Sequence, residues 1–459
     1  MSLSIQGRIM FQRIAFVSAL LLIPPSFLAC PSLLAADEAR PPNIILIMAD
    51  DLGYGDISPY GGWVKTPHLQ SLADEGVQFM DFHASASVCS PTRAGLLTGL
   101  YQQRLGIPGV LYANPARPEH YAGLSAEQTT MAEVFRDHGY RTALFGKWHL
   151  GYQAKHNPIL HGFDEFRGFV SGNIDYHSHI DLMGREDWWQ DQAKKKDKGY
   201  LTDLISEYAV DFIKANADRP FFLYLPHHAP HLPFQGPSDP SDRTVGGKFP
   251  VAGTVRDRKR AYREMVESMD AGVGLIRDAL KKYQLEKNTI IWFFSDNGAL
   301  SSVGSNKPLR GQKGEDWEGG HRVPSIISWP THVAPRKTDV LSSTLDVMPT
   351  VLDLAGIHFS GKMDGVDLGR FLLDSESPKQ GRKLFWWGDQ KQAWKGAAMR
   401  EGPYKLVVDR SQNQRPNIYL FDLRKDPGEQ HDIARQNPQQ LKKMLSDLTT
   451  WHRDVKRNH

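Results

Sequence analysis

The sequence predicts an α/β fold of the doubly wound class, with a smaller domain at the C-terminal end of the chain. Apolar runs without polar alternation, which are typical of strands buried on both faces of a parallel sheet, alternate with segments of helical periodicity. The 459 residues are 40% hydrophobic and 23% charged, as in soluble globular proteins, which excludes collagen-like, low-complexity and largely disordered classes.

The first 36 residues read as a secretory signal rather than as part of the fold. Two arginines precede the apolar run 14–28, and the small residues Ala35 and Ala36 indicate a cleavage site near Ala36. The run is shorter than the roughly 20 residues that a membrane span needs, so we expect no stable span. Attachment of a lipid to Cys30 is an alternative. The sequence therefore predicts an exported protein, either secreted or periplasmic.

Four apolar runs predict the strands of the main domain, over residues 44–48, 142–145, 221–225 and 290–294. Helical patterns lie between them, over residues 66–75, 130–138, 201–215 and 257–283. Polar side chains follow the runs: Asp50, Asp51, Lys147, His149, His227, His228, Asp296 and Asn297. Because ligands bind at the carboxyl ends of the strands in such sheets, we expect these side chains to converge on one site.

A change in charge and turn composition after about Phe371 predicts a domain boundary. We expect a signal segment over 1–36, a main domain over 37–372 and a C-terminal domain over 373–459. Lysine and arginine number 55 against 52 aspartates and glutamates, a net charge of +3, so nucleic acid is not expected as a partner. The two cysteines exclude a disulfide framework and a zinc site built from cysteines.

Four of the polar residues at the strand ends, Asp50, Asp51, Asp296 and Asn297, offer oxygen ligands. Adjacent carboxylates repel each other, and a cation would allow both to stay ionised. An all-oxygen donor set favours calcium or magnesium over zinc or copper. The same residues also occur in plain turns, so a site without metal is the alternative.

Cys89 opens the motif Cys-Ser-Pro-Thr-Arg, which ends at Arg93. Pro91 suits the first turn of a helix, so the thiol would lie near the positive helix N-terminus. A lowered thiol pKa and a nucleophilic role are expected in that position. A buried, inert cysteine is the alternative. Arg93 follows one helical turn after Cys89, so both side chains face the same way.

Six segments, taken in order, resemble the sulfatase family that depends on formylglycine. The segment 89–99 resembles that family's signature for oxidation of the cysteine, and Gly-Lys-Trp-His-Leu-Gly over 146–151 is similar to a second motif. The other segments are 43–54, 294–298, 310–320 and 419–429. The resemblance covers nearly all of the chain after the signal segment. Residues 308–311 are more similar to N-acetylgalactosamine and related carbohydrate sulfatases than to lipid or steroid sulfatases, and the chain as a whole also resembles arylsulfatases.

The resemblance implies an alkaline-phosphatase-like fold. This is a doubly wound, mixed but mostly parallel sheet with helices on both faces, followed by a smaller C-terminal α+β domain. That domain would hold a short antiparallel sheet and a helix near 438–451.

The resemblance also implies a chemistry for the site. A maturation enzyme would convert Cys89 to formylglycine, and Asp50, Asp51, Asp296, Asn297 and residue 89 would bind one Ca²⁺. The catalytic residues would be Cys89, Arg93, Lys147, His149, His228 and Lys313. Arg93 would hold the aldehyde hydrate, Lys147 and Lys313 the sulfate, and His149 would accept the second hydroxyl proton. His228 would give the leaving alcohol its proton. The family pattern of histidine, any residue and proline also fits His231, and we prefer His228 because it is nearer the strand end.

The expected function is therefore hydrolysis of sulfate monoesters, with a sulfated carbohydrate as substrate. Two alternatives stay open: a phosphate- or phosphonate-ester hydrolase of the same superfamily, and a sulfated-glycan-binding protein whose cysteine is never oxidised. A polar loop and two later residues are candidates for shaping the substrate pocket. They are Asn173, Asp175, Tyr176, His177, His179, Asn306 and Arg310.

Overall fold

The computed structural model describes residues 40–374, 381–388, 396–410 and 416–456 of the chain. The predicted signal segment 1–36, with Cys30, lies outside these residues. Within the described ranges, none of the helices combines the length and the apolar character that crossing a membrane requires.

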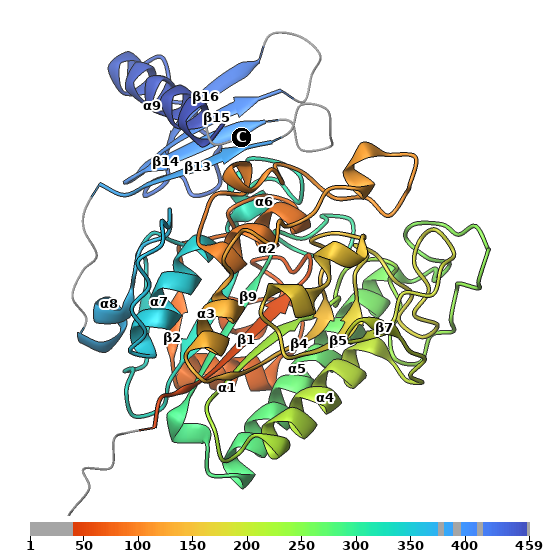
Figure 1. Cartoon of the computed structure of the whole chain (residues 1–459). Helices are drawn as coiled ribbons and strands as arrows, with labels where there is room; N and C mark the ends of the chain where they lie inside the picture. Colours follow the sequence, from red (N-terminus) through yellow and green to blue (C-terminus); the bar gives the residue numbers. More distant parts are fainter. Residues whose placement is uncertain (1–39, 375–380, 389–395, 411–415, 457–459) are drawn as a thin grey trace, which may run out of the picture. The chain divides into compact units, whose positions relative to one another are not determined.

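A large sheet runs through the main domain (Figure 1). In the described residues it has ten strands, in the order β11-β2-β10-β9-β1-β8-β4-β5-β6-β7. The central strands run parallel and contain the predicted apolar runs: β9 (Thr289–Ser295), β1 (Asn43–Ala49), β8 (Phe221–Pro226) and β4 (Arg141–Lys147). The other strands are β11 (Arg336–Thr338), β2 (Val77–Phe79), β10 (Ser325–Ser328), β5 (Glu165–Phe169), β6 (Trp189–Gln190) and β7 (Ala193–Lys194).

The sheet is mixed and mostly parallel, as predicted. Strand β5 pairs parallel with β4, and β11 pairs parallel with β2. Strand β10 runs antiparallel to β9 and β2, and β6 runs antiparallel to β5 and β7. A separate short pair is formed by β3 (Phe82–His83) and β12 (Ser342–Ser343).

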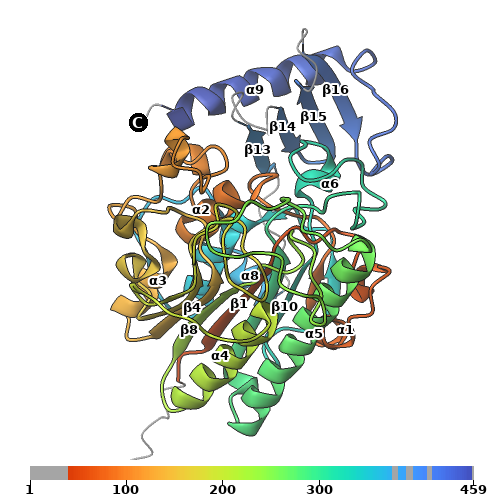
Figure 2. The same ribbon diagram turned by 90° about the vertical axis from the view of Figure 1, so that its right-hand side faces the viewer.

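Side chains of β1 point alternately into two hydrophobic cores, which explains why this strand is apolar throughout. Residues 44, 46 and 48 pack in the core that contains α2 (Cys89–Thr98), α3 (Met131–Asp137), α7 (Val347–Leu354) and α8 (Gly369–Asp374). Residues 45, 47 and 49 pack in the core that contains α1 (Pro67–Asp74), α4 (Leu201–Ala215) and α5 (Arg258–Lys282). Helices therefore cover both faces of the sheet (Figures 1 and 2), as predicted.

The helices predicted in the main domain differ from α1, α3, α4 and α5 by one residue or none at each end. The side chains of Thr130 and Asp257 fix two of the starts, because each accepts a backbone N–H of the first turn. The short helix α6 (Glu318–His321) was not predicted, since four residues give no readable periodicity.

The C-terminal part of the chain forms an antiparallel sheet, which has four strands in the described residues. Their order is β13 (Lys383–Trp387), β14 (Ala397–Glu401), β15 (Tyr404–Asp409) and β16 (Asn417–Asp422). Helix α9 (Pro438–Lys456) lies across this sheet (Figure 2) and is longer than predicted, because buried Val455 continues the apolar stripe of Leu448 and Trp451. The opposite face of the sheet packs against Trp317 and Val88 of the main domain.

Two glycines bring β4 and β5 close together just before Lys147. Gly146 and Gly168 face each other in register, and both have a positive φ, of 128° and 152°. A Cβ atom on Gly168 would lie 2.0 Å from the carbonyl oxygen of Gly146. The close approach therefore requires glycine at this position and fixes the end of β4, where Lys147 enters the site.

We expect Gly168→Ala to lower the free energy of unfolding by about 3 kcal/mol, because backbone strain and steric overlap add. Gly139→Ala is the matched control. Its φ is also positive, at 83°, but a Cβ would meet no described atom within 4 Å, so a loss of about 1 kcal/mol is expected. Denaturant titration measures both values, and equal losses would contradict the close approach of the two strands.

Candidate active site

The carboxyl ends of the four central strands bring the predicted polar residues into one buried site. Asp50 and Asp51 follow β1, Lys147 ends β4, and Asp296 and Asn297 follow β9. Helix α2 begins at Cys89 and is buried along its whole length, so Cys89 and Arg93 enter the same site from above the strand ends. Lys313 comes from a loop that precedes α6. The expected convergence is therefore present in the structure.

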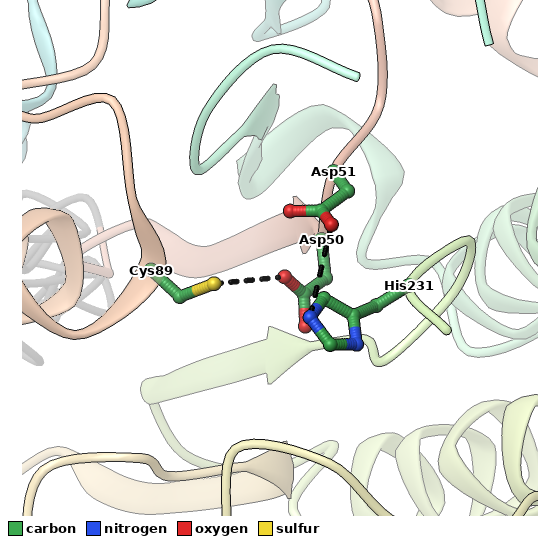
Figure 3. A group of neighbouring side chains, drawn as sticks. All are labelled: Asp50, Asp51, Cys89 and His231. Atoms are coloured by element: carbon green, nitrogen blue, oxygen red, sulfur yellow. Dashed lines mark hydrogen bonds and ion pairs between the residues drawn. The ribbon is translucent and has the colours of Figure 1, made fainter. Parts of the chain in front are cut away.

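Asp50 lies at the centre of the site (Figure 3). Its carboxylate accepts a hydrogen bond from Lys147 Nζ at 2.5 Å, and Cys89 Sγ lies 3.5 Å from its other oxygen. Arg93 Nη2 and His228 Nδ1 lie 3.5 and 3.4 Å from Asp50 Oδ2. Burial alone would raise the pKa of the Asp50 carboxyl, but Lys147 and the surrounding cationic groups hold it well below its ordinary value. Asp50 is therefore ionised.

Asp51 pairs with Lys313. The Lys313 Nζ atom lies 2.6 Å from Asp51 Oδ1 and 3.3 Å from Cys89 Sγ, so it bridges the carboxylate and the thiol. Asn297 Nδ2 donates to Asp51 Oδ1 at 2.7 Å. Asp51 has a left-handed backbone, with φ of 63°, which a residue other than glycine adopts at a cost. Burial and the neighbouring Asp50 raise the pKa of its carboxyl, which Lys313 opposes.

Asp296 is held by Arg93. Arg93 donates to Asp296 Oδ2 from Nη2 at 2.7 Å and from Nε at 3.2 Å, and the Asp51 backbone N–H donates to Asp296 Oδ1 at 3.2 Å. Burial and repulsion from Asp50 raise the pKa of Asp296 to about 7. The protein's own cations therefore do not fully stabilise the ionised forms of all three buried carboxylates.

These residues fit a hard divalent cation. Asp50, Asp51, Asp296 and Asn297 offer carboxylate and amide oxygens, the donors that Ca²⁺ and Mg²⁺ prefer. No donor in the described part of the chain reaches the buried Asn297 Oδ1, so this oxygen is free to bind a ligand. Asp50, Asp51, Cys89 and His231 also bring their ligand atoms within 4.8 Å of one another. The raised pKa of Asp296 also supports a cation site, because a bound cation would favour the ionised form of this carboxyl.

The thiol differs from the sequence-based expectation. Burial raises the pKa of Cys89 to about 12, although Lys147 and Lys313 act in the opposite direction. The predicted lowering by the helix N-terminus is therefore wrong, because Cys89 is only 2% exposed and loss of hydration outweighs the nearby positive charges. An unmodified Cys89 in this position is not a reactive thiolate.

A cavity of about 230 Å³ opens onto the site, and its wall includes Cys89, Lys313, His149 and His231. Neutral and aromatic side chains form most of the remaining wall: Val110, Leu111, Tyr112, Tyr152, Asn173, Leu182 and Leu232. Lys147, Arg93 and Asp50 lie beneath this wall and are fully buried. The cavity therefore gives an incoming group direct access to residue 89 and Lys313.

The two candidate histidines occupy different places. His231 lies on the cavity wall, and its Nε2 atom is 3.7 Å from Asp51 Oδ2. Figure 3 shows the His231 ring pointing toward Asp50 and Asp51. His228 is fully buried, stacks on Tyr176 with ring centres 4.8 Å apart, and faces Asp50. Burial lowers the pKa of both, to about 4 in His228. The geometry thus gives His231, rather than the preferred His228, contact with the cavity.

His149 also lines the cavity. Its Nε2 atom lies 2.9 Å from the carbonyl oxygen of Leu111, and among the described residues none bonds to its buried Nδ1 atom. Its backbone is left-handed, with φ of 55°. Burial and the nearby Lys147 hold the pKa of His149 well below its ordinary value, so the ring is neutral and can accept a proton.

Asn173 is the one residue of the predicted pocket set that the described cavity wall includes. Asp175 is turned into its own loop, where it accepts N–H groups of Ser178 and Asp242. Asn306 bonds Ala299, and Arg310 bonds the carbonyl oxygen of Glu429. Tyr176 supports His228, and His177 and His179 stack on other aromatic rings. These six residues do not line this cavity, because sequence proximity to a motif does not fix the direction of a loop side chain.

The sequence analysis missed several residues of the cavity wall and one residue that supports the wall. Tyr152 lies one residue beyond the 146–151 motif and could have been found there. The buried Arg243 donates to the carbonyl oxygen of Asn173 at 3.4 Å and holds this wall residue from behind. Arg243 stands in a loop without any motif, so nothing in the sequence indicated it.

Comparison with known proteins gives consistent matches. The family model "Sulfatase" matches residues 42–357, and the model "N-sulphoglucosamine sulphohydrolase, C-terminal" matches residues 313–454. Arylsulfatase A of Homo sapiens is 33% identical over 451 residues, which cover 86% of this chain and 84% of that protein. N-acetylgalactosamine-6-sulfatase of Rattus norvegicus is 34% identical over 377 residues, which cover 76% of this chain and 68% of that protein.

Among solved structures, Ps i-CgsB has a TM-score of 0.79 and 31% identity, over 90% of this chain and 93% of that one. A second structure of that protein is a complex with k-i-k-neocarrahexaose. The predicted alkaline-phosphatase-like fold, with its smaller antiparallel C-terminal sheet, is confirmed.

Any Cys89 that keeps its thiol should resist iodoacetamide at pH 8 in the native, calcium-free protein and react once the protein is unfolded. At a thiol pKa of about 12, the thiolate fraction at pH 8 is on the order of 10⁻⁴, and it should rise tenfold for each pH unit. Mass spectrometry of the Cys89 peptide measures the alkylated fraction. Rapid alkylation of the folded protein at pH 8 would contradict the burial of this thiol.

Proposed function

Because the chain belongs to the sulfatase family, whose members are sulfuric ester hydrolases, we propose that it acts on a sulfated carbohydrate through formylglycine at residue 89 and a bound Ca²⁺. One observation carries this proposal: Cys89 lies in contact with Asp50 and Lys313 at the floor of a cavity, above a cluster of buried carboxylates and cations. A maturation enzyme would have to oxidise Cys89 before the domain closes around it, since the folded thiol is buried.

The hydrated aldehyde supplies two hydroxyl groups on one carbon, of which one attacks sulfur and the other lets sulfate leave as the aldehyde re-forms. Arg93 supports this position from one helical turn away, and its ion pair with Asp296 fixes the guanidinium. Asp296 would take the first hydroxyl proton, since a bound cation would keep its carboxylate ionised. His149, a neutral ring that lines the cavity, would take the second.

Cations on the chain neutralise the sulfate. Lys313 Nζ lies on the cavity wall beside residue 89, and Lys147 Nζ lies behind Asp50. Both would stabilise the charge that grows on the sulfate oxygens and on the bridging oxygen in the transition state. When bound by Asp50, Asp51, Asp296, Asn297 and residue 89, Ca²⁺ would add Lewis acidity at the same oxygens.

We assign the proton for the leaving alcohol to His231 in place of His228. His231 lines the cavity into which the alcohol departs, whereas His228 is stacked on Tyr176 behind Asp50. A bound sulfate ester places negative charge beside the neutral His231 ring, which favours its protonated form. His228 would then orient the Asp50 carboxylate from 3.4 Å.

A sulfated carbohydrate fits the names of the relatives and the cavity. N-acetylgalactosamine-6-sulfatase acts on a sulfated sugar, as its name says. Ps i-CgsB has been solved in complex with k-i-k-neocarrahexaose, an oligosaccharide. Tyr112 and Tyr152 lie on the cavity wall, where Arg117 covers one face of the Tyr112 ring and His120 stacks on Tyr152, so a sugar ring could stack only on the opposite faces. A panel of sulfated mono- and disaccharides, with aryl phosphate in parallel, tests this proposal. Turnover of phosphate alone would favour the phosphoester hydrolase, and no turnover of any ester would favour the binding protein. We also propose that the protein is exported, since the sequence predicts a signal segment over 1–36.

Cys89→Ala should reduce turnover of 4-nitrophenyl sulfate by at least about 10⁴-fold, because no nucleophile remains. The wild-type Cys89 peptide should be about 18 Da lighter than expected for a thiol, as oxidation to the aldehyde requires. Cys89→Ser should be inactive as well, since one hydroxyl cannot expel sulfate. Circular dichroism checks that the variants fold. Full activity of the serine variant would remove the aldehyde from the mechanism.

Asp51→Asn should weaken Ca²⁺ binding at least about 100-fold and lower turnover with it, because a charged oxygen ligand is lost. Titration calorimetry measures the affinity, and a chelator followed by added Ca²⁺ should abolish and restore turnover of the wild type. The exposed Asp211→Asn on α4 is the control and should change neither quantity. Wild-type activity that survives complete chelation would refute the metal site.

His231→Ala should slow hydrolysis of an alkyl sulfate about 10²–10⁴-fold and of 4-nitrophenyl sulfate much less, because nitrophenolate leaves without a proton. His228→Ala should lower both rates by a similar factor, since it acts on Asp50. Steady-state kinetics on the two esters separates these patterns. The reverse pattern would return the acid role to His228.

A further inference from the structure

Lys313 stands in a loop, residues 310–319, that closes on itself. The Gly319 N–H donates to the carbonyl oxygen of Arg310 at 2.6 Å, which ties the two ends of the loop together. Lys313 N–H and Gly314 N–H donate to the carbonyl oxygens of Ala299 and Ser87, at 3.2 and 2.8 Å. These two backbone bonds join the loop to the segment after β9 and to the segment before α2, while the Gly319–Arg310 bond holds its two ends together.

Glu429 of the C-terminal domain holds both ends. Its Oε2 atom accepts the N–H of Glu318, which begins α6, at 2.7 Å. Its backbone carbonyl oxygen accepts Arg310 Nη1 at 2.9 Å. Glu429 is fully buried and has a left-handed backbone, with φ of 53°, and such strain persists where the surroundings determine the conformation. Glu429, a residue outside the main domain, therefore bonds to both ends of the Lys313 loop.

A buried lysine keeps Glu429 in place. Lys405 Nζ, on β15, lies 2.9 Å from Glu429 Oε1 and 2.9 Å from Glu318 Oε1, and all three side chains are fully buried. Burial raises the pKa of Glu429 to about 7. Burial would also raise that of Glu318, but Lys405 and neighbouring cations hold it well below its ordinary value. Because a buried charge without its partner is strongly unfavourable, the three groups fix one another.

The same cluster could be taken for a second metal site, since His83, Glu318 and His321 bring ligand atoms within 4.8 Å of one another. Lys405 Nζ, however, lies 3.1 Å from His321 Nε2 as well as 2.9 Å from Glu318. The ammonium therefore occupies the place that a cation would take. The cluster is an ion-pair network that joins β15 to the Lys313 loop.

We propose that Glu429 and Lys405 are positioning residues for Lys313, through which the C-terminal domain sets the distance between the Lys313 ammonium and residue 89. This inference rests on the role proposed above for Lys313. An error of about 1 Å in such a position can lower a rate about 10²-fold. The match of the C-terminal family model, which begins at residue 313, supports treating the loop and that domain as one structural unit.

Hydrogen exchange and kinetics on Glu429→Gln and Lys405→Met, in the full chain, test the proposal. We expect the amides of 310–321 to exchange at least about tenfold faster, while those of β1 and β9 keep their rates. The kcat for 4-nitrophenyl sulfate should fall about 10–100-fold. Glu401→Gln removes another glutamate–lysine pair of the same sheet, with Lys443 at 2.5 Å, and should change neither readout.

A double-mutant cycle separates positioning from a general loss of stability. If Glu429 acts through Lys313, adding Glu429→Gln to Lys313→Ala should lower kcat no further. An equal loss in both backgrounds, or unchanged exchange of 310–321, would overturn the proposal. If Glu429→Gln does not fold, Arg310→Met serves instead, since this exposed side chain donates to the Glu429 carbonyl oxygen. Arg310 also lies over the Trp317 ring at 3.6 Å, so Arg310→Lys, which keeps a cation there, is made in parallel.

Failure of the underlying function gives a different result. If Lys313→Ala retains full turnover, the proposed role of Lys313 falls, while faster exchange of 310–321 in Glu429→Gln would still support the structural link. Unchanged exchange with a large loss in Lys313→Ala would leave the role of Lys313 intact and remove the positioning by Glu429.

Discussion

Pairing between buried opposite charges holds this site together. Asp50, Asp51 and Asp296 would repel one another at the ends of β1 and β9, and each is matched by one cation, from Lys147, Lys313 and Arg93. Burial makes each pair strong and each unpaired charge costly. The strand ends, the start of α2 and the Lys313 loop are therefore positioned by the same contacts that would bind a sulfate and a divalent ion.

The same surroundings explain why an unmodified Cys89 is a poor nucleophile. Its thiol is only 2% exposed, and burial raises its pKa to about 12, so an unmodified Cys89 stays protonated at neutral pH. An oxygen nucleophile on that carbon does not need a thiolate, and it would be surrounded by Arg93 and Lys313 from the outset. The environment that makes residue 89 a poor thiol nucleophile thus suits it as the carrier of a hydrated aldehyde.

The C-terminal sheet contributes to the position of Lys313 in the active site. Its strand β15 supplies Lys405, and the turn after β16 supplies Glu429, which bonds both ends of the Lys313 loop. On the opposite edge of the site, Arg243 supports Asn173 in the cavity wall. In both places a buried charged residue that does not line the cavity supports one that does: Glu429 through the ends of the Lys313 loop, and Arg243 through its bond to Asn173. In this arrangement, residues that do not touch the substrate contribute to the specificity and the rate of the reaction.

The sequence by itself determined the layered fold and the contents of the site. Apolar runs and helical periods depend on local spacing. The ends of β1, β8, β9 and of four helices, α1, α3, α4 and α5, could therefore be predicted within one residue, and those of β4 within two. The residues that offer oxygen ligands were predicted from the polar segments at the strand ends. Cys89 and Arg93 were predicted from their motif and from their spacing of one helical turn. Tertiary structure alone decided the choice between His228 and His231, the high pKa of Cys89 and the reach of Glu429. Each of these depends on burial and on partners distant in the chain, which no local pattern records.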